Sequence, residues 1–217
     1  MTSPHPRPDP HGFTLLELLA TISIIAMLAA LSIPAIGKAR QAAEKSTCLA
    51  NLRQLGLGLR SYAQENGGVL PLSLNPDPLA SNSQVSWQIL IQRELNVAFP
   101  QAGQRSVFIC PSAARTYPQA PYRTYGLNLT GDSPTANPPR LLTLSAPSRS
   151  ALVVETKYET NGAGYGAISG SLTGVGGKGR LEARHSDMMN MLMADGSVRQ
   201  LRTDDPELDE LLQNIRK

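Results

Sequence analysis

The sequence has few of the residues on which catalytic and metal-binding proteins depend. Only two of its 217 residues are cysteines, Cys48 and Cys110, and only three are histidines. Two cysteines are too few for a cysteine-based zinc site, and their spacing excludes a C-x-x-C redox motif. No glycine-rich phosphate loop follows a predicted strand, and no Ser-His-Asp or Cys-His pattern is visible. We therefore expect a protein that is not an enzyme and that has no metal or other cofactor.

Long runs of one charge are absent as well. The formal net charge is +3, Lys and Arg never form a run longer than two, and aromatic residues make up 5% of the chain. A nucleic-acid-binding face needs clustered basic residues and often stacking rings. Nucleic acid is therefore not an expected partner.

A long apolar stretch begins abruptly at Phe13. Residues 1–12 are polar and contain four prolines, whereas residues 13–36 (FTLLELLATISIIAMLAALSIPAI) carry one charge, Glu17. As a helix this stretch would rise about 36 Å, enough to cross the about 30 Å of a bilayer core. Few soluble helices are apolar all round over this length. The pattern favours a membrane-inserted helix over a buried core helix.

A secretory signal peptide is the main alternative for this segment. Such a peptide has an apolar stretch of about 7–15 residues followed by a cleavage site with small residues. Here the stretch is longer, and Glu17 lies near its beginning. A carboxylate at mid-bilayer costs about 2.5–3.5 kcal/mol on insertion scales, so this charge indicates a partner or a function.

The segment Gly12–Glu17 (GFTLLE) with its apolar tail resembles the processing site of type IV prepilins and type II secretion pseudopilins. The resemblance implies that prepilin peptidase cuts between Gly12 and Phe13 and that the new N-terminus is methylated. It implies that Glu17 acts in assembly with other pilin or pseudopilin subunits at an inner-membrane platform. It also implies a helix kink at Pro34, a single membrane pass, and a C-terminal domain in the periplasm or on an extracellular filament.

The residues around the apolar stretch differ from the family pattern in one place. His11 precedes the glycine, where Lys or Arg is usual, and Arg7 is the one fixed positive charge before the stretch. Lys38 and Arg40 follow the stretch, so the positive-inside count is ambiguous. The expected orientation therefore depends on the resemblance.

Glu17 has a physical reason to act in assembly. In a bundle of apolar helices its carboxylate would be unpaired, and the positive amine of a neighbour's Phe13 would neutralise it, as a buried charge requires. The alternative is a surface glutamate whose side chain reaches the membrane interface near the helix start.

The helix is expected to continue as an amphipathic segment beyond the membrane. Apolar residues recur at steps of three and four, and Asn66-Gly67-Gly68 is a stop signal. The stripe consists of Cys48, Leu52, Leu55, Leu59 and Tyr62. We expect one helix from about Phe13 to Glu65, with its second half packed on a sheet. The expected organisation is a leader (1–12), a transmembrane and assembly helix (13–36) and a globular domain (37–217).

A second signature lies near the C-terminus. Nine residues separate His185 from Asp195-Gly196, and residues 48–71 with this H-x9-D-G pattern resemble a large pilin-like group. Asp-Gly between two apolar runs predicts a β-hairpin with strands Asn190–Ala194 and Ser197–Leu201.

The remaining pattern completes an α+β, pilin-like fold in which a long N-terminal helix lies on a small antiparallel sheet. Two further strands, two short helices and two irregular loops are predicted. They are strands Ser106–Cys110 and Ala151–Glu155, helices around Ser86–Leu95 and after Asp204, and loops Ser112–Pro147 and Gly162–Gly179.

Candidate sites in the domain have structural alternatives. A metal or catalytic centre is one interpretation of four polar residues near the C-terminus, His185, Asp187, Asn190 and Asp195. However, His185 is the one histidine beyond residue 11, and a zinc hydrolase needs three good ligands. We expect Asp195 and Gly196 to form a turn and His185 to satisfy backbone groups.

Calcium and a disulfide are the two other possibilities. Calcium at Asp132, Asp187 or Asp195 has no D-x-D-x-D-G ladder to support it. Cys48 and Cys110 are expected either to form one disulfide or to be two buried thiols, because sequence cannot establish the distance that a disulfide needs.

Two functions fit these patterns. The first is a structural subunit of a type IV pilus-like filament or type II secretion pseudopilus. The alternative is a low-abundance, membrane-anchored module whose loops bind a carbohydrate or a secreted protein. Dependence on Glu17 separates the two, because a simple anchor does not need this charge.

Overall fold

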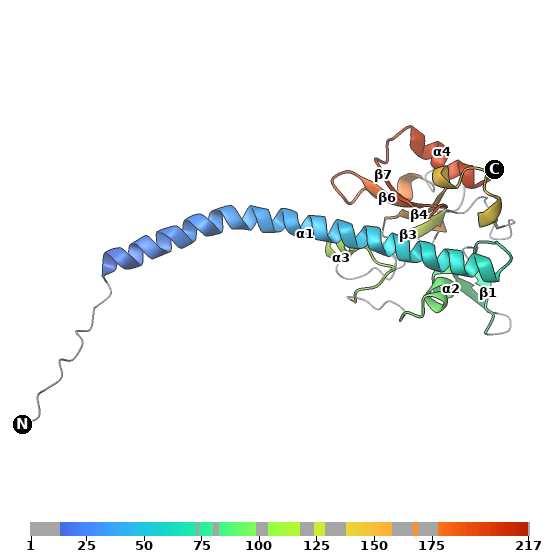
Figure 1. Ribbon diagram of the computed structural model, residues 1–217, viewed down its shortest axis with the longest axis horizontal. Coiled ribbons are helices and arrows are strands. Elements are labelled where there is room, and N and C mark those ends of the chain that lie inside the picture. Colours follow the sequence, from blue (N-terminus) through green and yellow to red (C-terminus); the bar gives the residue numbers. More distant parts are fainter. Residues whose placement is uncertain are drawn as a thin grey trace, which may run out of the picture. The chain divides into compact units, whose positions relative to one another are not determined.

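The computed structural model describes residues 14–72, 74–79, 83–98, 104–117, 124–128, 138–157, 167–168 and 178–216. The chain divides into two compact units, Met1–Ala42 and Ala43–Lys217. The helix α1, Leu15–Glu65, begins in the first unit and ends in the second (Figure 1).

The first unit is a solvent-exposed apolar helix. Every residue from Thr14 to Ala42 is exposed, including large apolar side chains such as Leu15, Met27 and Ile36. In the described part of the chain, α1 is the one helix that is long and apolar enough to cross a membrane. A soluble protein rarely leaves so much apolar surface uncovered, so this surface needs lipid or other helices around it.

Pro34 lies inside this helix. It has no N–H group for the usual bond to the carbonyl four residues earlier, and its ring crowds that carbonyl. The kink at Pro34 stays a prediction from the resemblance.

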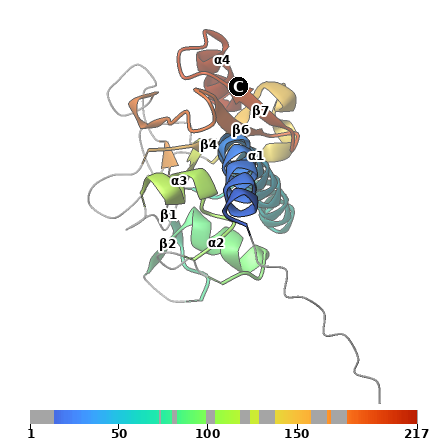
Figure 2. The ribbon, with the colours of Figure 1, turned by 90° about the vertical axis from the view of Figure 1, so that its left-hand side faces the viewer.

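The second unit is built on a five-stranded sheet. The strand order is β5-β3-β4-β6-β7, and every neighbouring pair is antiparallel except the parallel pair β3–β5. Figure 2 shows β4, β6 and β7 of this sheet beside one another. The strands are β3 Tyr125–Asn128, β4 Ala151–Glu155, β5 Ala167–Ile168, β6 Met189–Met193 and β7 Val198–Leu201. Strands β1, Leu74–Pro76, and β2, Gln84–Ser86, form a separate antiparallel pair. The predicted α+β fold with a long N-terminal helix is confirmed.

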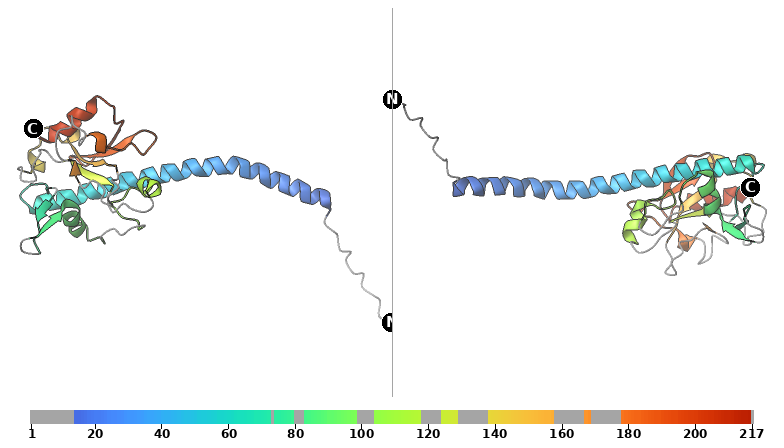
Figure 3. Two further views of the ribbon diagram at one scale, coloured as in Figure 1. Left: turned by 180° about the vertical axis from the view of Figure 1, so that it is seen from behind. Right: turned by 90° about the horizontal axis from the view of Figure 1, so that it is seen from below.

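Helices pack on both faces of the sheet's central strands (Figure 3). The second half of α1 buries Leu52, Leu55 and Leu59 in a cluster that includes Leu192 of β6. Helix α4, Glu207–Gln213, packs in another cluster that includes Met191, the neighbour of Leu192. Since neighbouring strand residues point to opposite faces, all of β6 is buried. The predicted packing of α1 on a sheet is confirmed.

Several predicted elements form where the local pattern is strong. Strand β4 has the predicted bounds, the β6–β7 hairpin turns at residues 194–197, and helix α2 spans Trp87–Glu94. Helix α4 begins after Asp205, whose Oδ1 accepts the Glu207 N–H at 2.8 Å. An acidic acceptor at this point suits the positive end of a helix.

The predicted strand Ser106–Cys110 is wrong. This segment is a turn in which the Ile109 N–H donates to the Ser106 carbonyl at 3.1 Å. Asn51 of α1 donates Nδ2 to the carbonyls of Ile109 (3.0 Å) and Ser106 (3.3 Å). Helix α3, Pro111–Thr116, then begins directly after Cys110. Val107, Phe108 and Ile109 are buried, but two carbonyls of the segment bond to a helix side chain instead of a neighbouring strand.

The two predicted irregular loops are also partly wrong. Residues 112–147 include most of α3, strand β3 and the 3-10 helix Leu141–Thr143. Residues 162–179 include β5 and the start of the 3-10 helix Lys178–Arg180. The other residues of these stretches lie outside the described residues or in short connections.

Gly58 on α1 permits a close approach of α2, and we expect Gly58→Ala to destabilise the domain. A Cβ atom at residue 58 would lie 2.6 Å from Ile91 Cγ2 and 3.0 Å from Leu95 Cγ. Alanine adds helix propensity of about 1 kcal/mol, but overpacking costs about 1–3 kcal/mol. Urea unfolding of the full chain in detergent, followed by the fluorescence of Trp87, should show a net loss of about 1 kcal/mol.

Gly56→Ala is the matched control on the same helix. Its Cβ would meet the flexible end of Leu192 at 3.1 Å, where a small side-chain movement suffices. A loss at Gly56 as large as the loss at Gly58 would contradict the special closeness of α1 and α2.

Candidate functional site

The side chains of Thr14 and Glu17, next to the predicted cleavage site, cap the N-terminus of α1. The Thr14 N–H donates to Glu17 Oε2 at 2.9 Å, and the Glu17 N–H donates to Thr14 Oγ1 at 3.2 Å. The Thr14 hydroxyl also donates to Glu17 Oε2 at 2.8 Å. This reciprocal arrangement is a capping box, which begins the helix at Leu15. The T-x-x-E pattern was the signal in the sequence for it.

The capping box leaves Glu17 able to take a further partner. Glu17 is exposed, and both hydrogen bonds from Thr14 to its carboxylate end on the same oxygen, Oε2. A carboxylate has two oxygens and about four acceptor positions, so an incoming amine can be added without breaking the cap. Gly12 and Phe13 lie outside the described residues, so cleavage and methylation there stay predictions.

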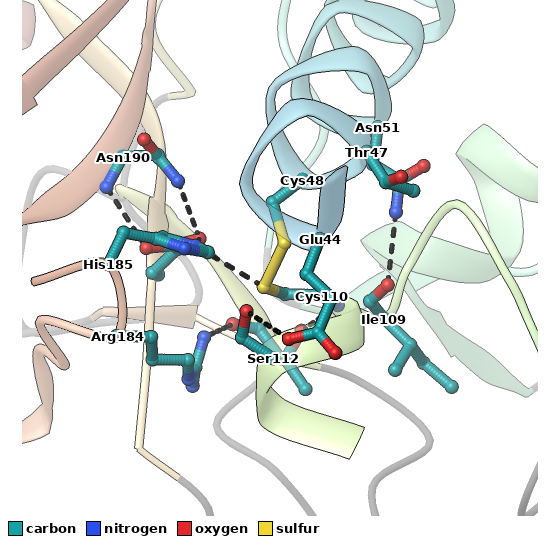
Figure 4. The surroundings of a disulfide bond; sticks show 12 residues. Glu44, Thr47, Cys48, Asn51, Ile109, Cys110, Ser112, Arg184, His185 and Asn190 are labelled. Atoms are coloured by element: carbon teal, nitrogen blue, oxygen red, sulfur yellow. Dashed lines mark hydrogen bonds and ion pairs between the residues drawn. A yellow bond between two sulfur atoms is a disulfide. The ribbon is translucent and has the colours of Figure 1, made fainter. Parts of the chain in front are cut away.

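A buried disulfide joins α1 to the segment before α3. Cys48 and Cys110 are bonded, with Cα atoms 5.0 Å apart, and neither side chain is exposed (Figure 4). Of the two possibilities left open by the sequence, the structure has the disulfide. Nearby, Glu44 of α1 accepts a hydrogen bond from the Ser112 hydroxyl at 3.2 Å and pairs with Arg115 at 3.4 Å. Helix α3 is therefore held to α1 by covalent and polar contacts together.

A histidine and a glutamate lie against this disulfide. His185 Nε2 is 3.0 Å from Glu155 Oε1 and 3.5 Å from Cys110 Sγ. Asn190 donates hydrogen bonds from its backbone N–H and from Nδ2 to the Glu155 carboxylate, each at 3.0 Å (Figure 4). Both His185 and Glu155 are buried, so this set of hydrogen bonds stabilises a carboxylate that burial alone would disfavour.

The H-x9-D-G residues lie at opposite ends of β6. His185 precedes the strand and contacts a carboxylate and a sulfur, where backbone partners were expected. Asp195 follows the strand, and its Oδ1 accepts the Ser197 N–H at 2.8 Å, while Gly196 has φ 90°. Arg60 of α1 donates to the Asp195 carbonyl at 3.2 Å. The signature therefore fixes both ends of one strand against other parts of the domain.

Two of the three aspartates considered for calcium, Asp187 and Asp195, lie at opposite ends of β6. Asp187 lies in the turn before β6 with φ 60°, and Asp195 lies in the turn after it. The five residues of β6 separate these turns, and Asp132 lies outside the described residues. The calcium hypothesis has no support from the arrangement of Asp187 and Asp195 and stays a prediction.

The structure instead brings together four potential metal ligands that the sequence did not group. One ligand atom each of Cys48, Cys110, Glu155 and His185 lies within 4.8 Å of every other, and all four residues are buried. The group comes from α1, the α3 entry, β4 and the turn before β6. Its one local signal was Glu155, a charge that ends the apolar run ALVV. While the sulfurs are bonded to each other, neither is a thiolate that can bind a metal.

Comparison with known proteins identifies the N-terminal segment. A family model described as the prokaryotic N-terminal methylation motif matches residues 7–33. No curated protein matches the chain. No solved structure matches it either.

This match supports a prepilin-type segment at the N-terminus of the chain. The motif implies processing by prepilin peptidase and assembly with pilin-like subunits. Together with the exposed apolar part of α1, it is consistent with membrane anchoring.

Proposed function

We propose that the chain is a structural subunit of a type IV pilus-like filament or a type II secretion pseudopilus. The observation that carries this proposal is the exposed apolar surface of α1, with an acidic residue in its first turn, within the segment that matches the methylation motif. An anchor needs the apolar length, but it does not need a carboxylate at a position where lipid would make it costly.

The apolar helix has two successive environments in this proposal. Before assembly, residues 13–36 span the inner membrane, where lipid covers the apolar side chains. During assembly the same surface packs against the helices of neighbouring subunits. Glu17 of one subunit pairs with the freed amine of Phe13 on another, which sets the register between the two helices.

The proposed organisation is a leader of residues 1–12, an assembly helix of residues 13–36 and a globular domain of residues 37–217. The domain lies in the periplasm or on the outside of the filament. The Cys48–Cys110 bond supports this location, because disulfides persist in oxidising compartments and are rare in the cytosol.

N-terminal analysis of the mature protein tests the proposal. In a host with prepilin peptidase, membrane-extracted protein should begin at Phe13 and carry one N-methyl group. Mass spectrometry of the N-terminal peptide measures both features.

A leader variant and a peptidase-deficient host are the controls. Gly12→Leu, or expression without the peptidase, should leave residues 1–12 attached. A mature protein that begins at any other residue in the complete host would contradict the subunit proposal.

A further inference from the structure

The four side chains around the disulfide form a complete ligand set for a soft or borderline metal ion when the sulfurs are free. We propose that, after reduction of the Cys48–Cys110 bond, the two thiolates, His185 Nε2 and a Glu155 carboxylate oxygen bind one Zn²⁺ ion. The site is independent of the proposed filament function, because all four residues belong to the second unit.

The ligand types match zinc chemistry. Zinc prefers four ligands in a tetrahedron, drawn from Cys sulfur, His nitrogen and Asp or Glu oxygen, at about 2.0–2.3 Å. Two ligands at these bond lengths lie about 3.3–3.8 Å apart in a tetrahedron. The distance from Cys110 Sγ to His185 Nε2 is 3.5 Å, and from that nitrogen to Glu155 Oε1 it is 3.0 Å. Two ligand–ligand distances of the tetrahedron are therefore close to the values that a bound zinc ion requires.

The remaining change is separation of the two sulfurs. Reduction removes the covalent bond and allows them to move to about 3.8 Å apart, the distance expected for two thiolates on one zinc ion. Rotation about the two Cα–Cβ bonds can provide this movement, because the Cα atoms are already 5.0 Å apart.

Outer hydrogen bonds already orient the ligands. Asn190 donates two hydrogen bonds to Glu155, and Gln200 of β7 donates to Asn190 Oδ1. On the other side, the Cys110 N–H donates to Thr124 Oγ1 at 2.7 Å. Such partners fix ligand orientation in metal sites and commonly change affinity by about 10–100-fold.

The reaction balances with a dithiol as the reductant. The dithiol gives two electrons and two protons to the Cys48–Cys110 bond and itself becomes a disulfide. Zinc then displaces the protons of both thiols and binds the thiolates, so metal uptake releases protons. In the reverse direction a small-molecule disulfide accepts two electrons from the thiolates and two protons from water to become a dithiol, while the sulfur–sulfur bond re-forms and the ion is released. The link between α1 and the α3 entry thus persists in both redox states, first as a covalent bond and then as a metal bridge.

Metal binding to the full chain in detergent tests the proposal. The protein is reduced with a dithiol under inert gas, freed of excess reductant, and equilibrated with Zn²⁺ or with Co²⁺ as a coloured substitute. The reduced protein should bind one Zn²⁺ per chain, and Co²⁺ should give thiolate-to-metal charge-transfer bands and tetrahedral d–d bands. The oxidised protein should give neither result.

Three variants separate the site from adventitious binding. His185→Gln and Glu155→Gln should each weaken zinc binding by more than about 100-fold, which exceeds the usual effect of an outer-shell partner. Ser112→Ala lies two residues from Cys110 without supplying a ligand and should bind zinc as the unaltered protein does. Stoichiometric zinc on the reduced protein that is insensitive to His185 and Glu155 would overturn the proposal.

A second measurement addresses loss of structure on reduction. If the reduced chain loses its near-ultraviolet circular dichroism, Zn²⁺ should restore the signal, because metal binding then stabilises the folded state. A reduced chain that stays folded without taking up zinc, or unfolds without recovery in zinc, would equally overturn it.

Discussion

Glu17→Gln is expected to abolish incorporation of the chain into a filament while leaving cleavage and the start of α1 intact. Glutamine is accepted at the third position of a capping box, so the hydrogen bonds with Thr14 can persist. The substitution removes only the negative charge. In the proposed assembly the neighbour's amine would then be buried without a counter-charge, and breaking such a pair costs about 3–5 kcal/mol.

Thr14→Ala is the matched control for this experiment. It removes the threonine side of the cap, at a cost of about 1 kcal/mol to the helix start, and keeps the charge of Glu17. A filament that depends on the charge pair should still contain Thr14→Ala subunits. Glu17→Ala, which removes both cap and charge, should behave like Glu17→Gln.

The assay is sheared or extracted filament probed for the chain, with cleavage followed in the same samples by N-terminal mass spectrometry. Normal assembly of the Glu17→Gln subunit would contradict the charge-pair mechanism. It would favour the alternative of a membrane-anchored binding module, since the apolar length of α1 suffices for an anchor.

The elements that the sequence predicted well are those with strong local patterns. Strand β4 begins with a continuous apolar run, and the turn at Asp195 directly follows the apolar run of residues 191–194. The α1 stripe of Cys48, Leu52, Leu55 and Leu59 follows the helical period and is buried. In each case the residues within one short window decide the structure.

The site in the domain could not be predicted in this way. Cys110, Glu155 and His185 are distant in sequence and meet only after β4 pairs with β6 and α1 covers the sheet. The turn at Ser106–Ile109 depends on Asn51, a side chain of another element. Such contacts depend on tertiary structure and leave no periodic signal. The short strand β3 was missed because it lies in a stretch interrupted by prolines.

Removing the disulfide with Cys48→Ser and Cys110→Ser together is expected to lower the free energy of unfolding by about 4 kcal/mol. The bond closes a loop between residues 62 positions apart, and the chain-entropy model gives about 4 kcal/mol for a loop of this size. A typical domain is stable by about 5–15 kcal/mol, so this loss is a large fraction of the total.

The remaining contacts between α1 and the α3 region limit the damage. Asn51, one turn beyond Cys48, still donates to the carbonyls of Ser106 and Ile109, and Glu44 still pairs with Arg115. These contacts can hold α1 against the α3 region in the folded double variant. We expect unfolding at lower urea with an intact native fold.

Urea unfolding of the full chain in detergent measures the effect. Trp87, the single tryptophan, is fully buried and reports on the domain core. A dithiol reductant with a zinc chelator should lower the stability of the unaltered protein by a similar amount and should leave the double variant unchanged. A loss below about 1 kcal/mol would mean that the packing and hydrogen bonds of α1 hold the domain without the covalent link. Cys48 is the first fully buried residue along α1. A large loss of unfolding free energy would therefore show that the disulfide at this residue is a main attachment of the helix to the domain.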